Sequence, residues 1–436
     1  MLQSYKEQQA KSLQLINFNK NDNTLFLNQE ALEILEQYDE NNIAFVSIVG
    51  LYRTGKSTLI NKLLNIDKGI GFKVESSTKA CTQGIWMWPD PQYNEQENLY
   101  IFFIDTEGSS NVESTNTFNN DAKIFTLTML ISSFFMFNSK GCINESAISQ
   151  LGLTCSLSKN IVVDEYGSFI QDDDLWKYSP CFMWVLRDFV LEITDQKGRN
   201  ISENQYLENS LNDNNVTDKQ QKNIRKCILQ YFKDRHCITF VQPVNEIDKL
   251  QKLDNIPQNQ LKQQFITQIN NLRKIIFQKT KAKIFKNKPL NARMMCSLLI
   301  SFVDNINCKQ GVPNLQAAWE NIIINECDKA KQVGLLQYES DLREYFQSKE
   351  KAIEFVVYKK NLEKYEIMLQ IDMIIQHHLQ KEVKFIIKQD RSQLRQCKKE
   401  KKNSFNQMKN QLKRNFHFIK LKKLRKNINK NNNNLK

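Results

Sequence analysis

The chain has no paired-cysteine pattern and no long apolar run. Its ten cysteines occur singly, without a CxxC pair, so the spacing predicts neither a zinc site nor a disulfide framework. Reduced thiols in a cytosolic chain are the simpler interpretation. The longest apolar stretch, "IFTLTMLISSFFMF" at 124–137, has 14 residues and contains Thr and Ser. It is too short to span a bilayer and indicates a buried helix.

Targeting signals are also lacking. The start, "MLQSYKEQQAKSLQL", has no apolar run after its charges, so we expect no signal peptide. The last residues, "NNNNLK", contain no prenylation box. We therefore expect a cytoplasmic protein whose contact with membranes, where it occurs, is peripheral.

Glycine becomes scarce in the second part of the chain. Ten of the 12 glycines precede residue 200, and long charged segments with helical apolar spacing follow Pro289. Earlier, short runs that are apolar on both faces alternate with helical segments and favour a mostly parallel sheet with helices on both faces. These runs are 43–50, 99–105, 181–189 and 236–242. We predict an α/β domain at 1–288 and an all-α helical domain at 289–436.

Acidic residues are nearly absent from the end of the chain. Residues 395–436 hold 15 of the 61 Lys and Arg residues but only Glu400 of the 48 acidic ones, which leaves 46 bases and 47 acids elsewhere. This basic tail suits an anionic membrane face or nucleic acid, or it is simply a solvated end. Its only Phe, Tyr or Trp residues are Phe405, Phe416 and Phe418, so it lacks stacking platforms and nucleic acid is the less favoured partner.

Residues 50–57 match the phosphate-binding pattern GxxxxGKS between an apolar strand and the helical "STLINKLLN". The two glycines let backbone N–H groups face phosphate oxygens, the Lys brings a positive charge to the β- and γ-phosphates, and the Ser hydroxyl serves Mg²⁺. The pattern predicts nucleoside triphosphate binding by Gly50, Leu51, Tyr52, Arg53, Thr54, Gly55, Lys56, Ser57 and Thr58. Arg53 either neutralises transition-state charge or is a surface residue.

Two further segments suit the same site. In "FFIDTEG" (102–108), Asp105 ends an apolar strand and would hold a Mg²⁺-bound water, while the Gly108 amide would reach the γ-phosphate. Glu107 stands where Ras-like proteins have a water-orienting Gln. In "STKACTQGIWMW" (77–88), Thr82 is the candidate to complete the Mg²⁺ shell. The metal candidates are thus Ser57, Thr82 and Asp105.

The candidate residue for recognising the nucleotide base lies at the end of a late strand. Asp188 follows "VLR" at the end of an apolar run, where a GTPase carries an Asp that accepts from guanine. A strand-end ion pair with Arg187 is the plain alternative.

Together, "GLYRTGKST", "GIWMW", "DTEG", "LRD" and "GVPNLQAAW" resemble the guanylate-binding proteins, large GTPases of the dynamin superfamily, over about residues 42–346. The resemblance implies a GTPase domain whose catalytic residues are Arg53 as an internal arginine finger, Thr82 as switch ligand and Glu107 in the switch region with Asp121. It also implies GTP and Mg²⁺ as ligands, guanine recognition by Asp188 with Arg187 beside the base, and homodimers that form through the GTPase domains on GTP loading.

One departure leaves the reaction open. The family usually has Ser-His-Thr at the switch, whereas this chain has Ala80-Cys81-Thr82. The first interpretation is a GTP hydrolase, the second a GTP-binding switch with little or no hydrolysis, and the third a nucleic-acid-binding P-loop ATPase. "LRD" and "GIWMW" speak against ATP.

Overall fold

A computed structural model describes residues 11–19, 24–51, 53–66, 71–74, 84–106, 115–159, 179–195, 197–213, 216–250, 253, 256–285, 288–307 and 315–347. The chain divides into two compact units, Met1–Glu339 and Ser340–Lys436. Nearly all of the described residues belong to the first unit, which contains the phosphate-binding motif.

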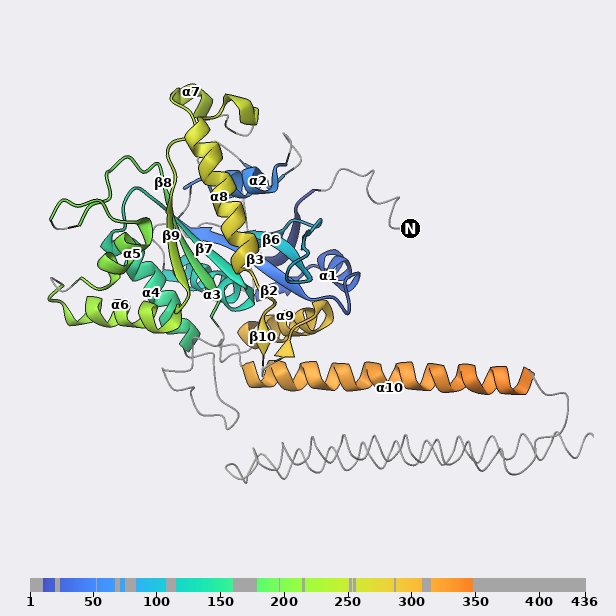
Figure 1. Cartoon of the computed structure of the whole chain (residues 1–436). Coiled ribbons are helices and arrows are strands. Elements are labelled where there is room, and N and C mark those ends of the chain that lie inside the picture. Colours follow the sequence, from blue (N-terminus) through green and yellow to red (C-terminus); the bar gives the residue numbers. More distant parts are fainter. Residues whose placement is uncertain are drawn as a thin grey trace, which may run out of the picture. The chain divides into compact units, whose positions relative to one another are not determined.

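A nine-stranded mixed sheet forms the centre of the first unit (Figure 1). Five neighbouring strands are parallel, in the order β6-β3-β7-β8-β9. Their bounds are β3 (Ile43–Gly50), β6 (Leu99–Thr106), β7 (Phe134–Lys140), β8 (Cys181–Arg187) and β9 (Arg235–Thr239). All four strand-like runs of the sequence are strands, and the α/β class is confirmed.

Four further strands extend the sheet with antiparallel pairing, which the sequence patterns did not indicate. β4 and β5 both pair with β6, β1 pairs with β4, and β2 pairs with β1. Their bounds are β1 (Leu13–Asn19), β2 (Thr24–Leu27), β4 (Ile85–Met87) and β5 (Gln92–Asn94). The "GIWMW" segment therefore places its middle residues in β4.

Helices cover both faces of the sheet because successive residues of the central strands are apolar on both sides. α2 (Lys56–Leu64) and α8 (Gln263–Lys279) pack against Ala44, Val46 and Ile48 of β3. The cluster on the opposite face contains residues of α1 (Gln29–Glu36), α3 (Thr115–Ile131), α4 (Glu145–Lys159), α5 (Glu203–Leu211), α6 (Lys219–Tyr231) and α9 (Ala292–Asn307). α5 begins with a capping box, in which Ser202 and Gln205 satisfy each other's backbone N–H groups.

The apolar run at 124–137 is not one helix, so that prediction was wrong. α3 ends at Ile131 and β7 begins at Phe134. The Ser132 hydroxyl donates to the Thr128 carbonyl at 2.5 Å and lies 2.6 Å from the Ser47 hydroxyl of β3, which satisfies the helix end locally. The following phenylalanines pair with β3 on one side and β8 on the other. This pairing, which no local pattern reveals, turns the second part of the run into a central strand.

The segment after β9 contains α7 (Ile247–Leu250), a 3₁₀ turn at Gln258–Gln260, and a small antiparallel pair of β10 (Ile284–Phe285) and β11 (Lys288–Pro289). α9 and α10 (Leu315–Gln347) follow, and α9 belongs to the core of the first unit. The domain boundary at residue 288 stays a prediction, and the basic tail lies outside the described residues. Among the described helices, none combines the length and the apolarity needed to cross a bilayer.

Candidate functional site

The predicted nucleotide residues gather at the carboxyl edge of the parallel strands. β3 ends at Gly50, opposite Asn138 of β7, while Ile48 pairs with Asp105 of β6. β8 ends at Arg187. Ligands of open α/β sheets bind at this edge because loops and helix N-termini converge there.

The phosphate-binding loop has a backbone that requires glycine. Gly50 has φ 143°, and a Cβ built there would lie 2.0 Å from the Asn138 carbonyl oxygen. Gly55 has φ 77° and is the N-cap of α2, where no side chain caps the helix. Arg53 between them also has a positive φ, 61°. The first N–H groups of α2 therefore stay available for an anion at the positive end of the helix dipole.

Lys56 and Ser57 begin α2 and point to different partners. Lys56 is buried, and its ammonium donates to the carbonyls of Gly50 at 3.3 Å and Leu51 at 3.1 Å. The Thr54 hydroxyl also donates to the Leu51 carbonyl, at 2.8 Å. The loop therefore curls around the Lys56 ammonium.

Ser57 meets the predicted metal residue Asp105. The Ser57 hydroxyl donates to Asp105 Oδ2 at 2.5 Å, and the Thr106 amide donates to Oδ1 at 3.0 Å. Burial raises the pKa of Asp105 to about 6, although the Lys56 charge and both hydrogen bonds act in the opposite direction. A buried carboxylate beside a hydroxyl at a helix start is an arrangement that favours a bound divalent cation.

Arg187 lies behind the loop. Its guanidinium is buried, donates from Nη1 to the Gly55 carbonyl at 3.0 Å, and lies 5.8 Å and 5.9 Å from the ring centres of Phe240 and Phe265. Burial lowers its pKa to about 10. Arg187 thus connects the end of β8 to the loop, and its predicted place beside the base stays a prediction.

Asp188 directly follows β8 in a left-handed conformation, φ 53°. Its carboxylate pairs with the Lys140 ammonium at 3.2 Å, and its side chain keeps 26% exposure. The partner in this ion pair thus comes from the end of β7, whereas the plain alternative named Arg187. A non-glycine residue at positive φ is uncommon, so Asp188 has an unusual backbone conformation.

The comparison with known families identifies the family of this chain. Residues 22–285 match the family model described as guanylate-binding protein, N-terminal domain. The chain belongs to the guanylate-binding protein family. It is 35% identical to human guanylate-binding protein 4 over 301 residues, which cover 67% of this chain and 46% of the relative. For human guanylate-binding protein 2 the identity is 36%, covering 66% and 49%, and for mouse guanylate-binding protein 1 it is 34%, covering 73% and 54%. The chain spans about half the length of these guanylate-binding proteins.

Several predicted site residues of this family member cannot be placed. Tyr52, Thr82, Glu107 and Gly108 lie outside the described residues, as does Ala80. Asp121 lies in α3, without a described side chain. Their roles stay predictions.

Two site residues were missed by the sequence analysis. Asn138 Nδ2 donates to the Thr54 carbonyl at 3.0 Å and to the Thr54 hydroxyl at 2.7 Å, while its buried Oδ1 has no hydrogen-bond partner among the described residues. Lys140 holds Asp188. Both lie at the end of β7, the strand that was read as part of a helix. The run "FFMF" followed by "NSKG" was the signal available in the sequence.

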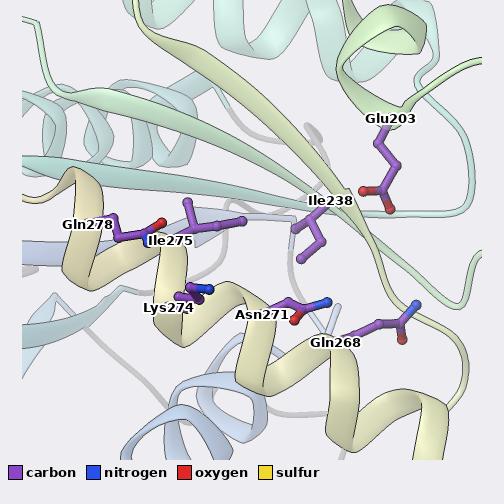
Figure 2. A pocket seen from close by; sticks show the side chains of 7 residues that line it. All are labelled: Glu203, Ile238, Gln268, Asn271, Lys274, Ile275 and Gln278. Carbon is purple, nitrogen blue, oxygen red and sulfur yellow. The ribbon is translucent and has the colours of Figure 1, made fainter.

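A described pocket of about 380 Å³ lies away from these residues, between α8 and β9. Figure 2 shows Ile238 of β9 beside the α8 side chains, with Glu203 above them. The lining residues are Glu203, Ile238, Gln268, Asn271, Lys274, Ile275 and Gln278. None of them was a predicted nucleotide residue, so this pocket is separate from the candidate phosphate site.

Proposed function

We propose that this guanylate-binding family member is a GTPase that binds GTP with Mg²⁺ at the carboxyl edge of its sheet and hydrolyses the γ-phosphate. The single observation that carries the proposal is the preformed loop at Gly50–Ser57, closed over Lys56 at the uncapped start of α2. Family membership supports guanine as the base and hydrolysis as the reaction.

The loop suits phosphate for electrostatic reasons. The Lys56 ammonium now binds two neutral carbonyls, and a triphosphate would offer it charged oxygens, which form stronger hydrogen bonds. No side chain caps the start of α2, so its first N–H groups would add donors at the positive end of the helix dipole. Positioning and electrostatic stabilisation are the main requirements of phosphoryl transfer, so a rigid loop is suited to it.

The residues present fit the metal that such a reaction needs. Ser57 and Asp105 lie within hydrogen-bonding distance, and burial raises the pKa of Asp105 although the Lys56 charge acts in the opposite direction. Ser57 would hold Mg²⁺ directly and Asp105 through water, with Thr82 as the proposed third residue. The ion would neutralise charge on the β- and γ-phosphate oxygens.

Arg53 and Glu107 would act in catalysis, and Asp188 would select the base. Arg53 would stabilise transition-state charge, and its positive φ at the middle of the loop turns the backbone sharply there. Glu107 would act in positioning water. Asp188, which is paired with Lys140, would accept from the guanine ring.

We further propose that two GTP-loaded chains associate through their GTPase domains, in a cytoplasmic protein whose basic tail contacts anionic membrane surfaces. The dimer rests on the family resemblance, and the membrane contact on the charge of residues 395–436. Deletion of these residues should abolish co-sedimentation with anionic vesicles. Unchanged co-sedimentation would remove the membrane contact and leave the GTPase proposal intact.

Phosphate release from GTP and from ATP, measured at several protein concentrations with chromatography of the products, tests the function. We expect release from GTP alone, with a rate per chain that rises with concentration. In Asp188→Asn, GTP affinity should fall about tenfold or more and xanthosine triphosphate should become a substrate, because the amide inverts one hydrogen bond to the base. Equal use of ATP and GTP by the unchanged chain would contradict the proposal.

A GTP-binding switch is the second candidate, and Ala80 at the expected serine position favours it. Tight GTP binding without phosphate release at any protein concentration would select the switch. An increase of about tenfold in single-turnover cleavage by Ala80→Ser would instead show that hydrolysis is only slowed.

A further inference from the structure

A cluster of three different ligand types lies at the other end of the parallel strands. Cys181 is the first residue of β8, while Asp234 and His236 flank the start of β9. The Phe182 amide donates to the Asp234 carbonyl at 2.9 Å, which holds the two strand starts together. Since the strands are parallel, this amino edge is opposite to the edge that carries the phosphate-binding loop.

The three side chains converge on one spot. One ligand atom from each of Cys181, Asp234 and His236 lies within 4.8 Å of the other two. His236 Nε2 is 2.8 Å from Asp234 Oδ1. Met183 pairs with His236, so Cys181 and His236 share the sheet face that α8 covers.

We propose that Cys181, Asp234 and His236 bind a divalent metal ion of the zinc class. Thiolate, imidazole and carboxylate are the ligands that Zn²⁺ takes in proteins, at about 2.0–2.3 Å each. In a tetrahedral arrangement, ligand atoms are then about 3.3–3.6 Å apart. The ligand atoms lie within 4.8 Å of one another, so they would have to shift to reach this range, and water would complete the coordination.

The thiol chemistry supports a soft metal. The Cys181 thiol is buried beside Asp234. Binding forms a metal–sulfur bond and releases the thiol proton to solvent, without any change in oxidation state. A hard ion such as Mg²⁺ binds thiolate weakly, so replacement of the thiol proton by Mg²⁺ is not favoured.

Lys279 already supplies a positive charge to the cluster. Its ammonium lies 3.3 Å from Asp234 Oδ1, and its side chain is 41% exposed at the last turn of α8. A metal ion would replace this ammonium, which can move into solvent at little cost because exposed ion pairs contribute little. The carbonyl end of α8 favours a cation in either case.

The seam between α8 and β9 offers access from solvent. Ile238 is two residues from His236 on the same face of β9, and it lines the open pocket shown in Figure 2. Gln278, which also lines this pocket, immediately precedes Lys279. An ion or a small chelate can thus approach the cluster along this seam.

Cobalt substitution tests the site on the reduced, chelator-treated full chain. Co²⁺ should give a thiolate-to-metal charge-transfer band that Zn²⁺ removes by competition, which distinguishes this site from the oxygen ligands proposed at the phosphate loop. Cys181→Ser should abolish the band, and His236→Ala should weaken Co²⁺ binding by about tenfold or more. Cys142→Ser is the matched control, because Cys142 is exposed and lies outside the cluster.

Lys279→Gln should strengthen Co²⁺ binding, whereas the substitutions of the ligands should weaken or abolish it. Removal of the competing ammonium should tighten Co²⁺ binding by about fivefold, the equivalent of one exposed ion pair. This variant also decides the matter if Cys181→Ser fails to fold, since an exposed helix-end substitution should leave the fold intact. No charge-transfer band in either the unchanged chain or Lys279→Gln would overturn the proposal, as would a band that persists in Cys181→Ser.

Discussion

Asp105→Asn should separate stability from function in this protein. Asp105 is fully buried, and its pKa is raised from 3.8 to about 6, chiefly by burial. The carboxylate is therefore costly in the nucleotide-free chain. An Asn at this position keeps the shape, can accept from the Thr106 amide, and can donate to the Ser57 hydroxyl, so no buried group loses its partner.

The magnitude follows from linkage. The folded chain binds the Asp105 proton more tightly than the unfolded chain, so the contribution of this group to stability is full below pH 4. It is lost as pH rises toward 6. About two pKa units at 1.36 kcal/mol each give ~3 kcal/mol. We expect Asp105→Asn to be about 1–3 kcal/mol more stable at pH 7 and to equal the unchanged chain near pH 4.

Urea unfolding without nucleotide, followed by tryptophan fluorescence at pH 4 to 8, measures this difference. All five tryptophans precede residue 340, so the signal reports the first compact unit. The same variant should lose Mg²⁺-dependent GTP cleavage. A stability difference that does not grow with pH, or a variant less stable than the unchanged chain at pH 7, would refute the reasoning.

Four further substitutions probe the loop and the core. Lys56→Ala should abolish triphosphate binding, whereas Arg53→Ala should leave binding and reduce single-turnover cleavage by up to about 10³–10⁵-fold; equal loss of binding would contradict this split. Asn138→Ala should weaken GTP binding by about tenfold in a titration, since Thr54 loses two hydrogen bonds, while Ser139→Ala should not. Burial lowers the pKa of Lys283 to about 7, so the unfolded chain binds more protons between pH 7 and 10.5 and stability should rise with pH there. Lys283→Met should remove that slope in urea unfolding and add about 2–5 kcal/mol at pH 7.

The central strands and the phosphate loop could be predicted because their signals are local. A buried parallel strand is a continuous apolar run, and the runs at 43–50 and 99–105 end at Gly50 and beside Asp105, as β3 and β6 do. The loop pattern needs a strand before it and a helix after it, and both are present. Local composition was therefore sufficient for these elements.

The antiparallel extension was not predictable for the opposite reason. β4 and β5 have three residues each, and their pairing with β6 is decided by neighbouring strands rather than by their own composition. The same holds for β7, which shares one apolar run with α3. Short runs of this kind are compatible with helix or strand until a partner is known.

The missed residues show how a wrong assignment of one strand hides a site. Asn138 and Lys140 are two residues apart on β7. Asn138 lies beside Thr54 and Lys140 beside Asp188, and these positions follow only from the parallel register of β7 with β3 and β8. The cluster at the opposite edge has the same origin: Cys181 and His236 are far apart in the chain, and neighbouring strand starts bring them together. Spacing motifs detect ligands within one loop or helix. Ligands on adjacent parallel strands require the strand order, so the Asn138–Thr54 contact and the Cys181–His236 cluster become visible only when that order is known.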